Sequence, residues 1–223
     1  MDHTKIERPS GEIMRRLAAI GTSTFANAFD AFGLFDNIMS GIGAAAPGFR
    51  FAGPAVTVQL SVGPPGTYSS ADFAVGAMID AAAAGDVVVV DGSGCRYSTW
   101  GGMASYAAKL KGIAGLLVDG AARDLEEMIA FEFPVFSRHI VPTTGRTRLR
   151  VEAINVPVTA GGVRVDPGDI IVADGSGALS IPAGKVGAIL EHAEKCQRDD
   201  DAAMTDLKNG MSFSEAMKKY RNI

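Results

Sequence analysis

The chain has 223 residues, of which 47% are hydrophobic and 7% aromatic, so it has enough apolar material for a single domain with one sizeable core. Its net charge of −4, with Lys and Arg scattered along the chain, argues against nucleic-acid binding. Cys95 and Cys196 lie far apart without His or Cys neighbours at metal-ligand spacing, which argues against a disulfide framework or a thiolate zinc site. The polar N-terminal segment, and the absence of an apolar run long enough to span a bilayer, predict a cytoplasmic protein without membrane contact.

Two helices are predicted near the N-terminus, the first capped by Ser10 and the second by Thr22 or Ser23. Apolar residues recur at helical spacing in both: Ile13, Leu17 and Ile20 in the first, Phe25, Phe29 and Phe32 in the second. We expect both apolar stripes to lie in the core.

The middle of the chain alternates between strands and helices. Strands are predicted at 54–60, 86–91, 113–119 and 133–138, with helices at 69–84, 103–110 and 124–131 between them. This order is typical of a parallel α/β layer.

After residue 155 the pattern changes. Residues 155–165 and 169–182 read as strands separated by Gly and Pro, with no room for helices between them, so they add antiparallel strands to an α/β fold. A long helix is then predicted at about 185–209, and its apolar stripe suits packing on a neighbour or a partner subunit.

The glycine-containing loop from Gly92 to Gly102 ends where a helix is predicted to start. Unpaired backbone N–H groups and the helix dipole make such a start a site for a carboxylate, and Gly101 and Gly102 would let a ligand approach the backbone. The alternative is that these glycines serve the geometry of the turn alone.

The segment DGAARDLEE, residues 119–127, places an Arg and several carboxylates beyond the end of a buried strand, where open α/β sheets bind ligands. The alternative is structural. In that interpretation Asp124 caps a helix, Glu126 and Glu127 favour its first turn, and Arg123 forms a surface ion pair.

One spacing favours the functional interpretation: Gly102, twenty residues, Arg123 and Asp124, two residues, and Glu127. This motif and the surrounding segment WGGMASYAAKLKGIAGLLVDGAARD resemble the class II pyruvate aldolases that act on 4-hydroxy-4-methyl-2-oxoglutarate and 4-carboxy-4-hydroxy-2-oxoadipate. These enzymes belong with the regulator of ribonuclease activity A and with sequences labelled demethylmenaquinone methyltransferase-like. The resemblance extends from Thr22 to Pro182 and includes TSTFANAFDAFG and INVPVTAGGVRVDPGD.

The resemblance implies a mechanism. Asp124 would hold Mg²⁺ or Mn²⁺, and Arg123 would bind the substrate and stabilise a pyruvate enolate. The substrate carboxylate would lie on the N–H groups after Gly102, those of Met103 and Ala104. The same arrangement would decarboxylate oxaloacetate.

The resemblance also implies an architecture: a layered α/β/β sandwich with a central mixed sheet or barrel, similar to the swivelling phosphohistidine domain, plus a C-terminal helical tail. The chain, residues 1–223, would be one domain in a homotrimer or homohexamer, with the tail from about 185 to 223 packing on a neighbouring subunit. Glu127, and Asp199 or Asp200 from that neighbour, would approach the metal. The alternative for Asp199 and Asp200 is a solvated charge run.

Two questions stay open at the level of sequence. In the loop, where Cys95 and Arg96 depart from the family pattern, Arg96 either binds a distal carboxylate or is a solvated residue. The second candidate function is a non-catalytic, protein-binding regulator resembling the inhibitor of ribonuclease E. Asp124 and Glu127 favour the enzyme, because a regulator has no need of a metal ligand.

Overall fold

The computed structural model describes residues 6–220. The ends of the predicted domain, residues 1–5 and 221–223, lie outside the described residues. Strand β2 (Phe51–Val62) is central to a mixed sheet, because it pairs in parallel with β3 (Val87–Asp91) and antiparallel with β7 (Leu149–Ile154) and β10 (Ile170–Asp174). Strands of both directions meet here, as predicted.

The parallel part of the sheet continues from β3 through β5 to β6, with the short strand β4 added at the end of β5. Its strands and helices are β4 (Ser98–Trp100), β5 (Gly115–Ala122), β6 (Val135–Ile140), α3 (Val75–Ala81), α4 (Gly102–Leu110) and α5 (Leu125–Ala130). The alternation predicted from sequence is confirmed. Strand β4 was not predicted, and β5 continues three residues beyond Asp119, where a loop was expected.

Antiparallel strands complete the sheet. Strands β10 and β11 (Gly177–Ile181) form a hairpin, and β8 (Val158–Ala160) and β9 (Val163–Val165) form a second, separate one. At the other edge, β1 (Gly43–Ala44) pairs with β6, and the segment just before β1 bonds to β11 through Met39 N and Ala178 O at 2.9 Å. The sheet is therefore nearly closed into a barrel.

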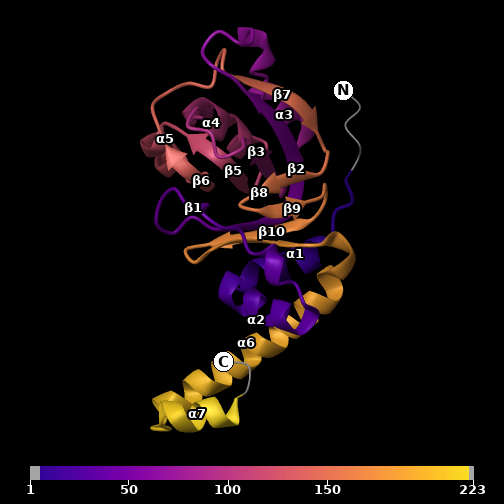
Figure 1. Ribbon diagram of the computed structural model, residues 1–223. Coiled ribbons are helices and arrows are strands. Elements are labelled where there is room, and N and C mark those ends of the chain that lie inside the picture. The colour runs from indigo at the N-terminus through magenta and orange to yellow at the C-terminus, as the bar shows by residue number, and fades with distance from the viewer. Residues whose placement is uncertain (1–5, 221–223) are drawn as a thin grey trace.

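Helices α1 (Gly11–Ala19), α2 (Thr22–Phe32) and α6 (Val186–Lys208) cover the β10–β11 hairpin (Figure 1). The side chain of Ser10 caps α1 as predicted, whereas the N-cap of α2 is Gly21 rather than Thr22 or Ser23. The predicted stripe on the first half of α6 is buried against α1, α2 and the hairpin of its own chain. The far half of α6 and α7 (Phe213–Lys219) project away from the sheet, which confirms a C-terminal helical tail.

The helix predicted at 69–84 is interrupted. Ser69 caps a 3-10 turn, η2 (Ser70–Asp72), and α3 begins only at Val75. Two further 3-10 turns, η1 (Phe35–Asn37) and η3 (Ala183–Lys185), follow α2 and precede α6. Among the helices between residues 6 and 220, none has the length and apolar composition that crossing a membrane requires.

Candidate active site

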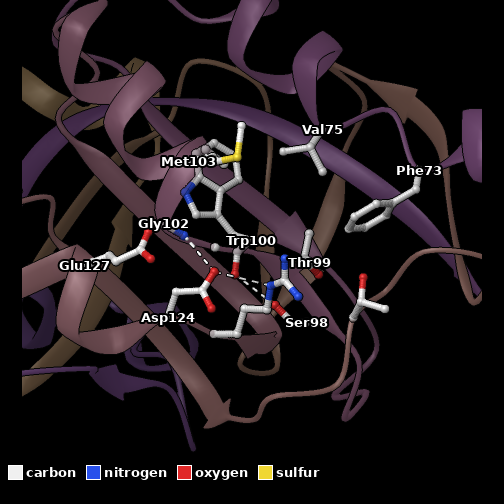
Figure 2. Close-up of a pocket in the computed structure, with 13 residues that line it drawn as sticks. Phe73, Val75, Ser98, Thr99, Trp100, Gly102, Met103, Asp124 and Glu127 are labelled. Atoms are coloured by element: carbon white, nitrogen blue, oxygen red, sulfur yellow. Dashed lines mark hydrogen bonds and ion pairs between the residues drawn. The ribbon is translucent and has the colours of Figure 1, made fainter.

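A cavity of about 300 Å³ lies where β4 and β5 end and α4 and α5 begin (Figure 2). This volume is at the lower end of the range for small-molecule sites. The lining residues are Phe73, Val75, Ser98, Thr99, Trp100, Gly101, Gly102, Met103, Ala104, Arg123, Asp124, Glu127 and Thr144. The sequence-predicted residues Gly102, Met103, Ala104, Arg123, Asp124 and Glu127 are thus brought together.

The pairing of β4 with β5 positions Arg123 and Asp124. The backbone N–H of Arg123 donates to Trp100 O at 2.9 Å, directly after the last residue of β5. The chain then turns sharply, because Asp124 has a left-handed backbone with φ 61° and ψ 48°. Asp is among the few non-glycine residues that tolerate this region, and such backbone strain is often found at functional sites.

The carboxylate of Asp124 joins two elements that are distant in sequence. Its Oδ2 accepts a hydrogen bond from Gly102 N at 3.1 Å and lies 3.3 Å from Arg123 Nε. Asp124 is the N-cap residue of α5 and pairs with a part-exposed Arg123, as the structural alternative expected, but its side chain makes no capping bond to α5. Glu126 and Glu127 do lie in the first turn of α5, as that alternative expected.

Glycine is required at both residues that open α4. A Cβ on Gly102 would overlap the carboxylate of Glu127, and a Cβ on Gly101 would lie 2.5 Å from Asp124 Oδ2 and 3.1 Å from Arg123 Nε. The space that these glycines leave is therefore occupied by the chain's own charged side chains. We expected these glycines to let a ligand approach the backbone, but side chains of the chain itself lie there instead.

The start of α4 keeps two donors free for a ligand. The N–H of Gly102 is bound to Asp124, and that of Ser105 donates to Gly101 O at 3.0 Å. Among the described residues, no group accepts a hydrogen bond from the N–H of Met103 or Ala104. These two donors at a helix N-terminus suit a carboxylate.

The ring of Trp100 is buried and supports the start of α4. Its side chain is 1% exposed and stacks on Phe133 with 6.2 Å between the ring centroids. Its Nε1 donates to Ser105 Oγ at 3.1 Å, and Ser105 Oγ donates to Gly101 O at 3.0 Å. These bonds hold the start of α4 at a fixed position relative to β4.

Besides Trp100, five lining residues were not predicted: Phe73, Val75, Ser98, Thr99 and Thr144. Thr99 is fully buried, and its Oγ1 has no hydrogen-bond partner among the described residues. An unpaired buried hydroxyl is costly, which makes it a candidate contact for a ligand. No sequence signal marks these residues, because they reach the cavity only through the pairing of β4 and the interruption before α3.

Other singled-out residues lie elsewhere. Arg96 is exposed, Cys95 is half-buried with a pKa raised by burial, and neither lines the cavity. Asp199 and Asp200 are half-buried on α6, also outside the cavity lining. Burial, followed by the charges of Asp201 and Asp199, raises the pKa of Asp200.

Asp119, the first residue of the acidic segment, has a structural role. Arg138 forms a two-pronged ion pair with its carboxylate, and Gly161 N donates to Oδ2 at 2.7 Å. Burial raises the pKa of Asp119, but these partners outweigh it, so the net pKa is lowered. The bond from Gly161, in the turn between β8 and β9, ties that hairpin to β5.

Asp124 and Glu127 offer two carboxylates to a cation. Within residues 6–220 no group of three or more His, Cys, Asp or Glu side chains is arranged to hold a metal ion. Asp124 Oδ1 makes no hydrogen bond to another described residue, so it is available as a ligand. Oxygen ligands from one or two carboxylates, completed by water, suit Mg²⁺ or Mn²⁺, so the residues present fit such an ion.

Known proteins resemble this chain in sequence and in fold. Over 192 residues, covering 86% of each chain, the sequence is 34% identical to the Halalkalibacterium halodurans protein named "Putative 4-hydroxy-4-methyl-2-oxoglutarate aldolase". An uncharacterized protein from Pseudomonas syringae pv. tomato has a solved structure with a TM-score of 0.87, 26% identity and 97% coverage of both chains. Streptomyces coelicolor RraAS2, described as an unusual member of the RNase ES inhibitor RraA protein family, gives 0.78 at 30% identity, covering 90% of this chain and 99% of that one.

The mixed, nearly closed sheet with C-terminal helices is thus shared with solved relatives, and the aldolase name of a relative supports a lyase. A family profile described as "RraA-like: Aldolase/RraA" matches residues 22–179, which include every residue that lines the cavity. The chain belongs to the RraA-like family of aldolases and RraA proteins.

Proposed function

We propose that the protein is a divalent-metal-dependent class II pyruvate aldolase that cleaves 4-hydroxy-2-oxo acids of the 4-hydroxy-4-methyl-2-oxoglutarate type and decarboxylates oxaloacetate. One observation carries the proposal. Arg123 and the carboxylate of Asp124 lie at the same end of a small cavity as the free N–H groups of Met103 and Ala104. A guanidinium, a metal ligand and a carboxylate site are the three parts that this chemistry requires.

Each residue has a defined part in the reaction. The substrate carboxylate binds the N–H groups of Met103 and Ala104, which directs the 2-oxo group toward Arg123. The C4 hydroxyl loses its proton to water, the C3–C4 bond breaks, and its electron pair forms the enolate of pyruvate. The guanidinium of Arg123 stabilises the negative charge on the enolate oxygen, and a proton then returns to C3.

Asp124 and Glu127 are the proposed residues for Mg²⁺ or Mn²⁺. A bound divalent ion supplies Lewis-acid polarisation of the 2-oxo group. The hydrogen bond from Gly102 to Asp124 Oδ2 fixes the carboxylate and leaves Oδ1 free of hydrogen bonds to other described residues.

The test is coupled detection of pyruvate from 4-hydroxy-4-methyl-2-oxoglutarate and from oxaloacetate. We expect turnover with Mg²⁺ or Mn²⁺ and its loss with a chelator. An absence of metal-dependent turnover with both substrates would contradict the proposal.

We further propose that the far half of α6 and α7 pack on a neighbouring subunit of a homotrimer or homohexamer, where Asp199 or Asp200 approaches the metal. Two features support this: α6 projects away from α4 and α5 of its own chain (Figure 1), and the tail exposes Met204, Phe213 and Met217. Asp199 and Asp200 would then act in trans.

Subunit mixing tests this second part. Chains with Arg123→Ala are combined with chains carrying Asp200→Ala, subunits are allowed to exchange, and pyruvate release is measured. Recovered turnover is expected, because a mixed oligomer contains sites in which both residues are intact. Full activity in Asp199→Ala, Asp200→Ala and the double variant would exclude a role in trans.

The similarity to RraAS2 favours one alternative, a non-catalytic regulator that binds a ribonuclease. The cavity argues for the enzyme, because a protein-binding surface has no need of a strained Asp124 beside Arg123 in the lining of a cavity. Absence of turnover together with binding to a ribonuclease E-type enzyme would favour the regulator.

A further inference from the structure

The charges that line the cavity are one short for the proposed aldol substrate. Arg123 contributes one positive charge, and Asp124 and Glu127 contribute two negative charges. A bound divalent cation brings the total to one positive charge, whereas 4-hydroxy-4-methyl-2-oxoglutarate brings two carboxylates. One of these carboxylates would lose hydration without gaining a partner of opposite charge, unless a further cation lies beside the cavity.

Arg148 is a cation beside the cavity. Its Nη1 donates to the backbone oxygens of Thr144, which lines the cavity, and of Arg146, each at 3.2 Å. The guanidinium lies 5.5 Å from the centroid of the Tyr97 ring. These contacts hold one edge of the guanidinium against the turn formed by residues 144–148.

The other edge of the same guanidinium has no partner. Arg148 Nε is buried without a hydrogen bond, and no described residue accepts a hydrogen bond from Nη2. A buried donor without a partner is costly, above all on a charged group. Nε and Nη2 form the pair of parallel donors that binds a carboxylate on two prongs. The chain uses this same pair of atoms where Arg8 binds Asp86 and where Arg138 binds Asp119.

The turn that carries Arg148 lies at the end of the cavity away from Asp124. Figure 2 shows Phe73 across the cavity from Asp124, and a Cβ on Gly145 would lie 2.8 Å from Phe73 Cε2. The N–H of Gly145 donates to a backbone oxygen of β4 at 2.9 Å, which fixes the turn to the sheet. A substrate anchored by its 2-oxo acid group at Arg123 extends its second carboxylate toward this turn.

Thr144 offers a neutral donor at the same place. Its Oγ1 accepts a hydrogen bond from Arg146 N at 3.2 Å, and no described residue accepts the proton of this hydroxyl. The hydroxyl of Thr144 and the guanidinium of Arg148 are thus two neighbouring donors with capacity for a carboxylate.

We propose that Arg148, through Nε and Nη2, binds the second carboxylate of a dicarboxylic 2-oxo acid, with Thr144 Oγ1 as a further donor. The proposal rests on the proposed function for the position of the 2-oxo acid group. Because Arg148 Nε is closed to solvent, binding includes a local shift of the guanidinium or of the side chains that cover it. Arg96, which the sequence offered for this part, is exposed and lies outside the lining.

The chemistry of cleavage is compatible with this contact. In 4-hydroxy-4-methyl-2-oxoglutarate the second carboxylate is bonded to C4 and stays intact when the C3–C4 bond breaks. It leaves as the carboxylate of the second pyruvate. Holding it therefore orients the substrate without opposing the reaction.

A matched pair of unreactive ligands tests the selectivity by binding alone. 2-Oxoglutarate and 5-methyl-2-oxohexanoate have similar shapes, with the terminal carboxylate of one replaced by an isopropyl group in the other. Neither has a C4 hydroxyl, so neither undergoes aldol cleavage. By calorimetry in the presence of Mg²⁺, we expect 2-oxoglutarate to bind about tenfold more tightly or better, as one close charge pair allows.

Variants of Arg148 locate the subsite. Arg148→Met should remove the preference for 2-oxoglutarate and leave the affinity for 5-methyl-2-oxohexanoate unchanged, which also shows that the variant is folded. Arg148→Lys keeps the charge and the apolar stem but loses the two-pronged edge, so we expect it to lower the preference severalfold. A parent-like affinity ratio in either variant would overturn the proposal.

Arg150→Met is the matched control, because it removes the same charge two residues away. Arg150 is exposed, binds Glu152, and lies 5.0 Å from the centroid of the Tyr68 ring. We expect its affinity ratio to equal that of the parent chain. A loss of preference as large as in Arg148→Met would show that net charge, and not a contact with Arg148, sets the selectivity.

This inference and the proposed function fail in different ways. Equal or weaker binding of 2-oxoglutarate by the unmodified chain would overturn the role of Arg148, while leaving a working 2-oxo acid site. Binding of neither ligand, together with no pyruvate release, would instead contradict the proposed function.

Discussion

Asp124 Oδ2 accepts a hydrogen bond from the backbone N–H of Gly102 at 3.1 Å and thereby links the end of β5 to the start of α4. The bond crosses 22 residues of sequence. The bond explains why an Arg-Asp pair and a distant glycine belong to one motif. Glycine leaves room for the carboxylates of Asp124, which follows β5, and Glu127, which lies on α5.

Gly102→Ala should remove pyruvate release and lower the free energy of unfolding by about 1 to 3 kcal/mol, because the added methyl group overlaps the Glu127 carboxylate. Gly187→Ala on α6 is the control, since nothing lies within 4 Å of a Cβ there and helical Ala is favoured over Gly. Denaturant unfolding and the coupled pyruvate assay measure both effects. Normal activity in Gly102→Ala would show that Glu127 can move without consequence.

Thr99→Val keeps the shape of the side chain and removes the unpaired hydroxyl. We expect the free energy of unfolding to stay the same or rise, because a buried oxygen without a partner is lost. Substrate KM should rise by about tenfold if Oγ1 binds substrate, and Thr99→Ser should restore it. Unchanged kinetics in Thr99→Val would assign Thr99 to packing alone.

The sequence predicted the lining residues near the starts of α4 and α5, but not those from β4 or from the segment around the start of α3. Arg123, Asp124 and the start of α4 follow from the end of one strand and the start of one helix, which are local patterns. Phe73 and Thr99 depend on tertiary structure: Phe73 lies where a helix predicted as continuous is interrupted, and Thr99 lies in a strand of three residues inside an expected loop. Strand β4 forms because β5 offers a partner, and its own sequence carries little signal.

Arg138→Met should lower the free energy of unfolding at neutral pH by about 2 to 3 kcal/mol, because it leaves the nearly buried carboxylate of Asp119 without its cation. Arg164→Met is the control, since Arg164 and Asp166 form an exposed pair, and we expect little change there.

The ion pair between Arg138 and Asp119 also makes the stability of the fold depend on pH. The pKa of Asp119 is lowered in the folded state, so its contribution to stability is present above the unfolded pKa and is lost as pH falls through the folded pKa. Acid titrations of unfolding should therefore show a smaller loss of stability on acidification in Arg138→Met than in the parent chain. Equal slopes would show that Arg138 does not control this titration.

Arg123→Lys keeps the positive charge and loses the planar, two-pronged donor group. We expect turnover to fall by about 100-fold, with a much smaller change in the Kd for Mg²⁺, because the guanidinium acts on the developing enolate. Steady-state kinetics and calorimetry separate the two quantities. Unchanged turnover would place Arg123 outside the chemistry.

The central claim is that the carboxylate of Asp124 holds the metal in addition to the start of α4, and Asp124→Asn tests it most directly. Asn tolerates the left-handed backbone at this residue and retains a side-chain oxygen that can accept the hydrogen bond from Gly102. We expect a thermal unfolding midpoint close to that of the parent chain, loss of the calorimetric Mg²⁺ signal, and at least about a 100-fold fall in metal-dependent pyruvate release. Parent-like Mg²⁺ binding and turnover in Asp124→Asn would contradict the account.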